Sequence, residues 1–357
     1  MLFEEGIKSK KTLAKYNESL NTFLDWARST PQNLIDLDEK TIQITLEDYI
    51  IFLKRRDLSY SFINLSLSAI FKFLDMNDKV YNKTKLRRLL PEKKKASGKK
   101  AYTTQQIQTM LGFADTLRNK SLIHFYSATG CRSAVVEELK FKHLLPMPDN
   151  CYAVTCYAGS NHEYITFLHQ EARGVLDQYL EERRKKGELI QDESFVFPHI
   201  KNFRNRPKAV TGDTVNGVIW RILQKAKIQR NLSESGKRYD TATINGFRKR
   251  FNTILKNNPK ISYAIAERMM DHSAYLEKQY HDTSDINKFF EEYKKAIPDL
   301  LISSEERLKL QISKQENESE MMKKYEERLS KAEKLILKLL HKTNPEVNPE
   351  KDRFIIE

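Results

Sequence analysis

Apolar positions in the first ninety residues follow helical spacing. Three segments repeat apolar side chains at steps of three and four, which places them on one face of a helix. Ser9 stands just before the first segment, where its side chain can cap a helix. The pattern predicts a compact all-α domain over residues 1–90. The side chains expected to face its core are Leu13, Tyr16, Leu20, Phe23, Leu24 and Ala27 in the first segment, Ile44, Leu46, Tyr49, Ile50 and Leu53 in the second, and Phe62, Leu65, Ile70, Phe71 and Phe73 in the third.

Residues 91–100 interrupt this pattern with the sequence PEKKKASGKK. Its five lysines, its glycine and its lack of large apolar side chains are typical of a flexible linker. A basic linker can lie along a phosphodiester backbone, and each phosphate that it neutralises adds to the salt dependence of binding. The lysines predicted to contact DNA are Lys93, Lys94, Lys95, Lys99 and Lys100.

The next two hundred residues combine helical periodicity with a pair of strands. The β-rich runs 151–157 and 163–168 flank a polar stretch and predict a hairpin. Helical spacing surrounds this hairpin, so residues 101–302 are expected to form a mixed α+β domain. The segments predicted to be helical are 135–139, 170–186, 210–228, 241–255 and 261–270.

A long helix is predicted over residues 303–342, and residues 343–357, with two prolines, are predicted to be disordered. Apolar positions in this helix recur at steps of four and three, the spacing of a coiled-coil seam. Such a seam predicts a partner helix, and the alternative is a helix that packs on its own domain. The positions of the seam are Leu308, Ile312, Gln315, Ser319, Met322, Tyr325, Leu329, Ala332, Ile336 and Leu339.

The distribution of charge favours a polyanionic partner. The formal net charge of the 357 residues is +14, and the segment from Ser303 to the end carries twelve basic and twelve acidic side chains. The whole excess therefore lies in residues 1–302, which suits nucleic acid, although excess charge also serves solubility. Basic side chains of the first domain that can touch phosphates are Lys54, Arg55, Arg56, Lys83, Lys85, Arg87 and Arg88.

Several classes of protein are disfavoured by what the sequence lacks. No apolar run of eighteen residues and no signal-peptide core occur, so we expect a cytoplasmic, DNA-associated protein without a membrane partner. Cys131, Cys151 and Cys156 form no metal-binding pattern, and buried free thiols are expected. There is no phosphate-binding glycine loop and no acidic cluster of two-metal spacing. Kinases, helicases and metal-dependent nucleases are therefore disfavoured, and no cofactor is predicted.

Four short motifs occur in order between residues 129 and 281: Thr129-Gly130-Cys131-Arg132, Asn245-Gly246-Phe247-Arg248, Asp271-His272-Ser273 and Tyr280-His281. Together they resemble the active-site motifs of tyrosine recombinases, the phage-type integrases. The later stretch 291–297 resembles the tail of archaeal-type integrases in particular.

The resemblance implies a mainly α, multidomain fold with a small β-sheet, in which an all-α core-binding domain precedes an α+β catalytic domain. It implies double-stranded DNA as the partner and dimers or tetramers on that DNA. Arg132 and Arg248 would bind the scissile phosphate, His272 would donate one more hydrogen bond, and Tyr280 would attack to form a 3′-phosphotyrosine. Tyr275 is the second choice for the nucleophile.

Basic residues next to the second arginine motif extend the predicted DNA surface. Arg248, Lys249 and Arg250 fall between the apolar steps of their segment, so they are expected on its other faces. Lys249 and Arg250 are predicted to contact DNA.

The chain departs from the family pattern at four positions. Val135 replaces a Glu that usually supports the site, and Asp271 replaces a Gly beside His272. Asn245 replaces a His, and Asn161 stands where the hairpin carries the Lys that protonates the leaving 5′ oxygen. An amide cannot deliver a proton, whereas His162 next to it can.

Three functions therefore remain open from the sequence. The first is a site-specific recombinase or integrase, and the second is a degenerate relative that binds DNA without strand exchange. The third is an interaction protein that acts through its C-terminal helix.

Overall fold

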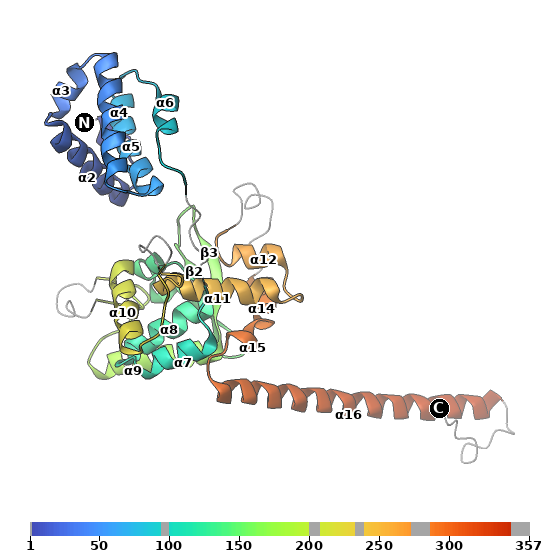
Figure 1. The fold of residues 1–357 in the computed structure, drawn as a ribbon. Helices are drawn as coiled ribbons and strands as arrows, with labels where there is room; N and C mark the ends of the chain where they lie inside the picture. Colours follow the sequence, from blue (N-terminus) through green and yellow to red (C-terminus); the bar gives the residue numbers. More distant parts are fainter. Residues whose placement is uncertain (1, 94–99, 200–207, 233–238, 273–285, 344–357) are drawn as a thin grey trace. The chain divides into compact units, whose positions relative to one another are not determined.

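The computed structural model describes residues 2–93, 100–199, 208–232, 239–272 and 286–343. It divides into two compact units, Met1–Ala96 and Ser97–Glu357. The boundary between them falls within the lysine-rich stretch 91–100. The fold is mostly helical with one small antiparallel sheet, as the sequence predicts (Figure 1).

The N-terminal unit is a helical bundle whose helices begin where the sequence offers capping side chains. The Ser9 hydroxyl accepts a hydrogen bond from the backbone N–H of Thr12, and Asp38 and Ser59 cap two later helices in the same way. The helices are α1 (Leu2–Glu5), α2 (Lys10–Ala27), α3 (Pro31–Asp36), α4 (Glu39–Arg55), α5 (Tyr60–Asp75) and α6 (Lys83–Arg88).

Three of the predicted core positions in this bundle are wrong: Ile44, Phe62 and Leu65 are exposed. The buried face of α4 instead begins at Ile42, and Ile44 lies two residues further on. Residues two apart point to different faces of a helix. On α5, Ile63 is buried in place of Phe62. Both residues are apolar and adjacent, so the sequence does not show which of them faces the core.

The second unit surrounds a three-stranded antiparallel sheet with helices (Figure 1). The strands are β1 (Leu144–Met147), β2 (Cys151–Cys156) and β3 (Tyr164–Leu168), in the order β1-β2-β3. The predicted hairpin is confirmed as β2 and β3, in which Val154 pairs with Thr166. The edge strand β1 was missed, because it is short and contains a proline.

The helices of the second unit match most of the predicted segments. They are α7 (Thr104–Gly112), α8 (Leu117–Thr129), α9 (Gln170–Lys185), α10 (Gly212–Lys225), α11 (Thr243–Asn257), α12 (Tyr263–Arg268), α14 (Ile286–Lys294), α15 (Ile297–Leu300) and α16 (Ser304–Thr343). The segment predicted as a helix over 135–139 is a 3₁₀-helix, η1 (Ser133–Glu137), and a second one, η2, spans Phe141–His143.

Helix α8 is the central element of this unit, because its side chains from Ser121 to Thr129 are buried on every face. It packs against α9, α11 and β3. A helix that is enclosed on all sides need not be amphipathic, and in α8 the polar side chains of Ser121, His124 and Ser127 are buried along with the apolar ones. Its end is fixed by Gly130, whose φ of 60° is left-handed. A Cβ at Gly130 would lie 2.4 Å from the ring of Phe251 on α11, so the chain can turn towards Arg132 only with glycine here.

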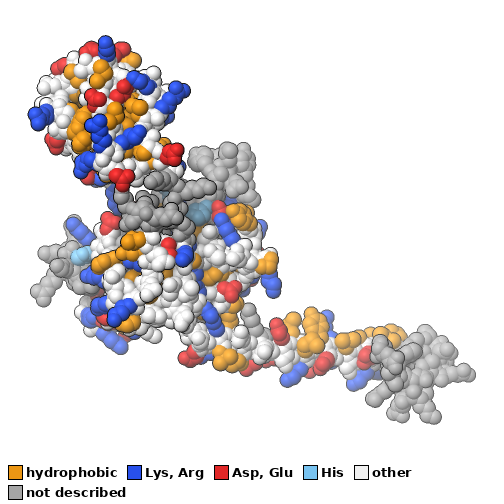
Figure 2. Space-filling model, viewed as in Figure 1, with side chains coloured by type: hydrophobic (Ala, Val, Ile, Leu, Met, Phe, Trp, Pro, Cys, Tyr) orange, Lys and Arg blue, Asp and Glu red, His pale blue; other side chains and the backbone are white. Residues whose placement is uncertain are grey.

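Helix α16 is attached to the second unit at its beginning. Arg307 donates to the carbonyl of Leu301 from its Nε, at 3.1 Å, and the backbone N–H of Ser303 donates to Glu171 on α9. Leu310 packs partly against the core, but Ile312 and the later apolar side chains whose burial is described are exposed. Hydrophobic side chains are visible along the helix in Figure 2. In this chain the described part of α16 beyond Leu310 is not packed on its own domain.

The three cysteines are free and buried, as predicted. The sulfur atoms of Cys131 and Cys156 lie 3.3 Å apart, within hydrogen-bonding distance and without a disulfide bond. Within the described residues, no helix is long and apolar enough to cross a membrane. That part of the chain also contains no group of three or more His, Cys, Asp or Glu side chains placed to hold a metal ion.

Candidate active site

Arg248 on α11 is a buried arginine whose guanidinium group joins three parts of the chain. Its side chain lies inside the second unit, with 8% of the residue exposed. Nη1 donates to the carbonyl of Gly130 at 2.8 Å, and Nη2 donates to the carbonyl of Met270. Nη2 also lies 2.8 Å from Nε2 of His272. The guanidinium therefore connects α11 to the end of α8 and to the segment after α12.

The contact with Arg248 defines the protonation state of His272. Because a guanidinium group can only donate hydrogen bonds, Nε2 of His272 must be the acceptor, and the proton of the neutral ring is then on Nδ1. Nδ1 lies 3.5 Å from Oε1 of Glu267, which also forms an ion pair with Lys256 at 2.5 Å. Burial and the charge of Arg248 hold the pKa of His272 below its ordinary value of 6.5, and Glu267 opposes part of this shift.

Arg132 approaches the same segment from the other side. It follows Gly130, and its Nη1 donates to Oδ2 of Asp271 at 2.8 Å while its Nη2 donates to the carbonyl of Asp271 at 3.2 Å. The Arg132 side chain is 41% exposed, whereas that of Asp271 is 5% exposed. The guanidinium group is thus held at one edge and open to solvent elsewhere.

The turn of the β2–β3 hairpin brings a further imidazole to this cluster. His162 is largely exposed, and its Nδ1 lies 3.5 Å from Oδ2 of Asp271. The backbone N–H of His162 donates to the Ser160 hydroxyl at 3.1 Å, and the N–H of Gly159 donates to Glu163 at 2.5 Å. Asn161 is exposed beside them. The hairpin therefore contacts the cluster through His162.

Three of the predicted catalytic residues meet at one place. Arg248 contacts residues 270 and 272, and Arg132 contacts the residue between them, Asp271. Asn245 is exposed near the start of α11. Both tyrosines considered as the nucleophile, Tyr280 and Tyr275, lie outside the described residues. The arrangement provides two fixed positive charges, and guanidinium groups are donors that suit the non-bridging oxygens of a phosphodiester. The single N–H of the neutral His272 ring is on the side of Glu267.

The sequence profile described as the phage integrase family matches residues 100–284, which is more than half of the 357 residues. The chain belongs to the phage integrase family, whose members are tyrosine recombinases. A comparison with curated proteins gave no match.

Solved structures of other tyrosine recombinases share the fold of this integrase-family chain. A complex of the transposon Tn1549 integrase with transposon right-end DNA has a TM-score of 0.52 and 17% identity, and the match covers 82% of this chain and 97% of that one. A post-cleavage complex of the XerH site-specific recombinase with a palindromic difH substrate has a TM-score of 0.53 and 16% identity, with 78% of each chain covered. A lambda integrase tetramer bound to a Holliday junction has a TM-score of 0.50 and 16% identity, with coverage of 78% and 75%.

Arg250 does not have the position that was predicted for a DNA contact. It is buried in the integrase fold, with 5% of the residue exposed, and it donates to the carbonyls of Asp299 and Leu300 and to the hydroxyl of Thr104. Burial lowers its pKa to about 10. All its described contacts are internal, so the prediction of an exposed DNA-binding arginine is wrong. Arg248 is likewise buried, although its spacing had suggested an outer face.

The other predicted DNA contacts have varied surroundings. Lys93 is exposed, and Lys249 is half-buried. Lys100 is exposed, forms an ion pair with Asp240 at 3.2 Å, and donates its backbone N–H to the Asp240 carbonyl. Lysines 94, 95 and 99 of the linker lie outside the described residues.

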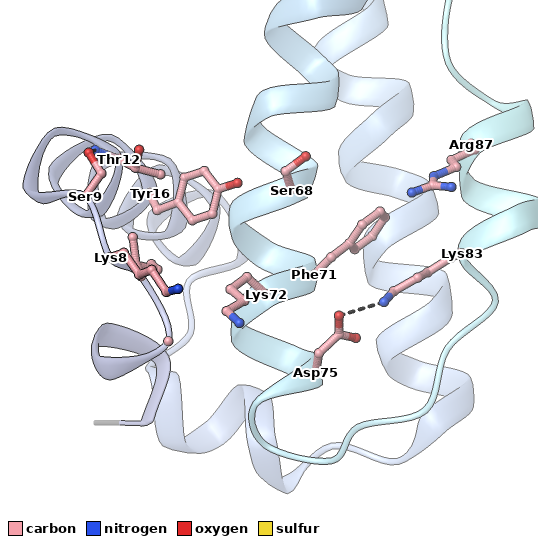
Figure 3. Close-up of a pocket in the computed structure, with 12 residues that line it drawn as sticks. Lys8, Ser9, Thr12, Tyr16, Ser68, Phe71, Lys72, Asp75, Lys83 and Arg87 are labelled. Carbon is pink, nitrogen blue, oxygen red and sulfur yellow. Dashed lines mark hydrogen bonds and ion pairs between the residues drawn. The ribbon is translucent and has the colours of Figure 1, made fainter. Parts of the chain in front are cut away.

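A basic pocket of about 460 Å³ lies in the N-terminal unit, between the start of α2, α5 and α6 (Figure 3). Its cationic side chains include two that the sequence assigned to phosphate contacts, Lys83 and Arg87. Lys83 is paired with Asp75 at 2.6 Å. The other cations that line it are Lys8 and Lys72.

The sequence did not predict which residue holds the Arg132 side chain in place. Val135, at the position of the family's Glu, is buried in η1. The nearby Glu137 accepts a hydrogen bond from the backbone N–H of Gly212 and so connects η1 to α10. Support for Arg132 comes instead from Asp271. The only available signal was the unusual residue beside His272, and its partner lies 139 positions earlier.

The pKa of His272 tests this geometry. In the titration of the His272 ring by NMR, we expect a pKa below 6.5, and we expect it to fall further in Glu267→Gln because the carboxylate that favours the protonated ring is lost. Glu291→Gln, which removes an exposed carboxylate on α14, should leave the titration unchanged. A pKa above 6.5, or a rise in Glu267→Gln, would contradict the described contacts.

Proposed function

We propose that this chain is a site-specific recombinase that cuts and rejoins double-stranded DNA through a 3′-phosphotyrosine at Tyr280. The observation that supports this most strongly is the attachment of Arg132 and Arg248 to one three-residue segment, 270–272, together with His272. Tyr280 follows this segment by eight positions in the sequence. In the proposed function, the segment brings the nucleophile to the phosphate that the arginines bind.

The reaction that fits these residues is a transesterification. The phenolic oxygen of Tyr280 forms a bond to phosphorus while the bond from phosphorus to the 5′ oxygen breaks, and the phenol gives up its proton to a water molecule as it attacks. Negative charge develops on the non-bridging oxygens, and Arg132 and Arg248 stabilise it because guanidinium groups stay charged and donate in pairs. The energy of the broken ester bond is conserved in the new phosphotyrosine ester, so neither metal nor nucleotide is required for rejoining.

The departing 5′ oxygen needs a proton, and we assign its delivery to His162. The Asn161 amide cannot release a proton at neutral pH, whereas an imidazole can. His162 stands at the turn of the hairpin, is open to solvent, and lies 3.5 Å from a carboxylate that is itself bound to Arg132. The hairpin would thus place an acid beside the arginine that binds the phosphate.

A DNA-binding protein without strand exchange is the second candidate function. It is favoured by Asn161 and Asn245, two exposed amides at positions where the family has a Lys and a His. Loss of a general acid alone reduces a rate by about 10² to 10⁴. The two candidates share DNA binding and differ in whether a covalent intermediate forms.

We propose that DNA is contacted by both units, which would act as a core-binding domain over residues 1–90 and a catalytic domain over residues 101–302, joined by the linker 91–100. In the first, exposed cations and the basic pocket with Lys8, Lys72 and Arg87 offer positive charge to phosphates.

We further propose that α16 pairs with the same helix of a second chain. Its apolar side chains from Leu308 to Ile336 are exposed wherever burial is described, except for partly buried Leu310. The alternation of steps of four and three is interrupted once, because the step of three to Met322 is followed by another step of three to Tyr325. This interruption divides the helix into two stretches of coiled-coil spacing. Aligned in parallel and in register, each stretch places opposite charges at the flanking positions that face each other across the dimer. These pairs are Glu318 with Lys323 and Arg328 with Glu333 of the second copy.

A suicide substrate, in which a nick beside the cleavage site lets the short 5′ product diffuse away, separates the two candidates. Wild type should form a denaturant-resistant protein–DNA adduct, and Tyr280→Phe should form none because the nucleophile is lost. Tyr275→Phe is the matched control and should retain the adduct. If wild type binds the DNA in a salt-sensitive manner but forms no adduct, the protein is the non-exchanging candidate. If Tyr280→Phe forms as much adduct as wild type, the assignment of the nucleophile is wrong.

Self-association through α16 is measured on the full chain without DNA by analytical ultracentrifugation. Leu329→Asp with Ile336→Asp should shift the protein from dimer to monomer, because charges would enter the apolar seam. Ser330→Asp with Lys334→Asp places the same side chains on the outer face and should leave the dimer intact. Equal sedimentation of the two variants would contradict pairing through this seam.

A further inference from the structure

The carboxylate of Asp271 lies between the two groups that flank the proposed phosphate site. Its Oδ2 is 2.8 Å from Nη1 of Arg132 and 3.5 Å from Nδ1 of His162. The carbonyl of the same residue accepts a second hydrogen bond from Arg132. One residue therefore holds both ends of the Arg132 guanidinium group and contacts the hairpin.

Burial indicates on which side of Arg132 this carboxylate lies. The Asp271 side chain is 5% exposed and the Arg132 side chain is 41% exposed. A carboxylate that occupied the phosphate position would itself be open to solvent, because DNA must reach that position. Guanidinium has five N–H donors, and the hydrogen bonds of Arg132 to described residues use two of them. Arg132 can therefore bind Asp271 on its inner side and a phosphate oxygen on its outer side.

The backbone adds a second argument. Asp271 has a φ of 52°, in the left-handed region that glycine adopts most readily. An aspartate is tolerated there but is less stable than glycine. The backbone conformation would thus favour glycine over aspartate at this position. The aspartate side chain that is present makes a contact with Arg132.

We propose that Asp271 is a positioning residue that orients Arg132 for the scissile phosphate and holds the His162 turn beside it. The proposal rests on the recombinase function proposed above. It replaces the support that the family's Glu would give, since Val135 is apolar and buried at that position. In this proposal the two departures from the family pattern compensate each other: Val135 removes the carboxylate that supports the arginine, and Asp271 supplies another.

The test uses full-length protein and the suicide substrate, with rates of adduct formation measured in a single turnover. Asp271→Asn keeps the shape but loses the charge, and it should slow adduct formation by about 10-fold or more while DNA affinity at fixed salt stays within about twofold. In the background of Arg132→Ala, Asp271→Asn should cause a much smaller loss than in wild type, because only its contact with His162 then remains. Asp177→Asn, which breaks an ion pair with Arg173 on α9, is the matched control and should keep the wild-type rate.

Two results would overturn this role. If Asp271→Asn is as fast as wild type or faster and binds DNA more tightly, the carboxylate competes with the phosphate. If the losses from Arg132→Ala and Asp271→Asn multiply, the two residues act independently.

A second measurement does not depend on activity. The guanidinium NMR signals of Arg132, assigned with Arg132→Lys, should be those of a restrained group in wild type and of a freely rotating group in Asp271→Asn. Absence of any adduct from wild type would refute the proposed recombinase, whereas unchanged Arg132 signals in Asp271→Asn would refute the positioning role alone.

Discussion

The buried guanidinium group of Arg248 is the interaction on which the site depends. A charge inside a protein is tolerated only when its donors are satisfied, and a hydrogen bond to a charged group contributes about 1.5–3 kcal/mol. Arg248 meets this requirement with the carbonyls of Gly130 and Met270 and with His272. The need to satisfy these donors fixes the end of α8 and the segment after α12 against α11. The position of Arg132, two residues after Gly130, follows from the same constraint.

The pattern of apolar residues was sufficient to predict most helices and the hairpin, because periodicity and capping are local properties of the sequence. Ser9 and the segment after it illustrate this, since both the cap and the helix are found. Local information failed where the outcome depends on distant partners. Arg248 and Arg250 were expected on outer faces, but both are buried, because their guanidinium groups donate to backbone carbonyls on distant parts of the chain. Periodicity also could not choose between Phe62 and Ile63 as the buried position on α5.

The motifs predicted which residues of the site come together, and they did not predict how these residues are supported. Arg132, Arg248 and His272 could be named from short patterns, and they meet at residues 270–272. The partner of Arg132 could not be predicted. From the sequence alone, the carboxylate of Asp271 beside an anion site is expected to repel the anion. Its burial changes that interpretation, since a carboxylate on the inner side of a guanidinium group restrains it without blocking the outer side.

The central claim is that Arg132 and Arg248 stabilise the charge on the non-bridging oxygens of one phosphodiester. Single-turnover cleavage of a suicide substrate with a methylphosphonate at the scissile position tests it most directly, because this group lacks one charged oxygen. On the ordinary phosphodiester, Arg132→Ala and Arg248→Ala should each slow cleavage by about 10²–10³. On the methylphosphonate, the cleavage rate of at least one of the two variants should be reduced, relative to wild type, by much less than on the phosphodiester. Equal losses on both substrates, for both variants, would contradict the claim.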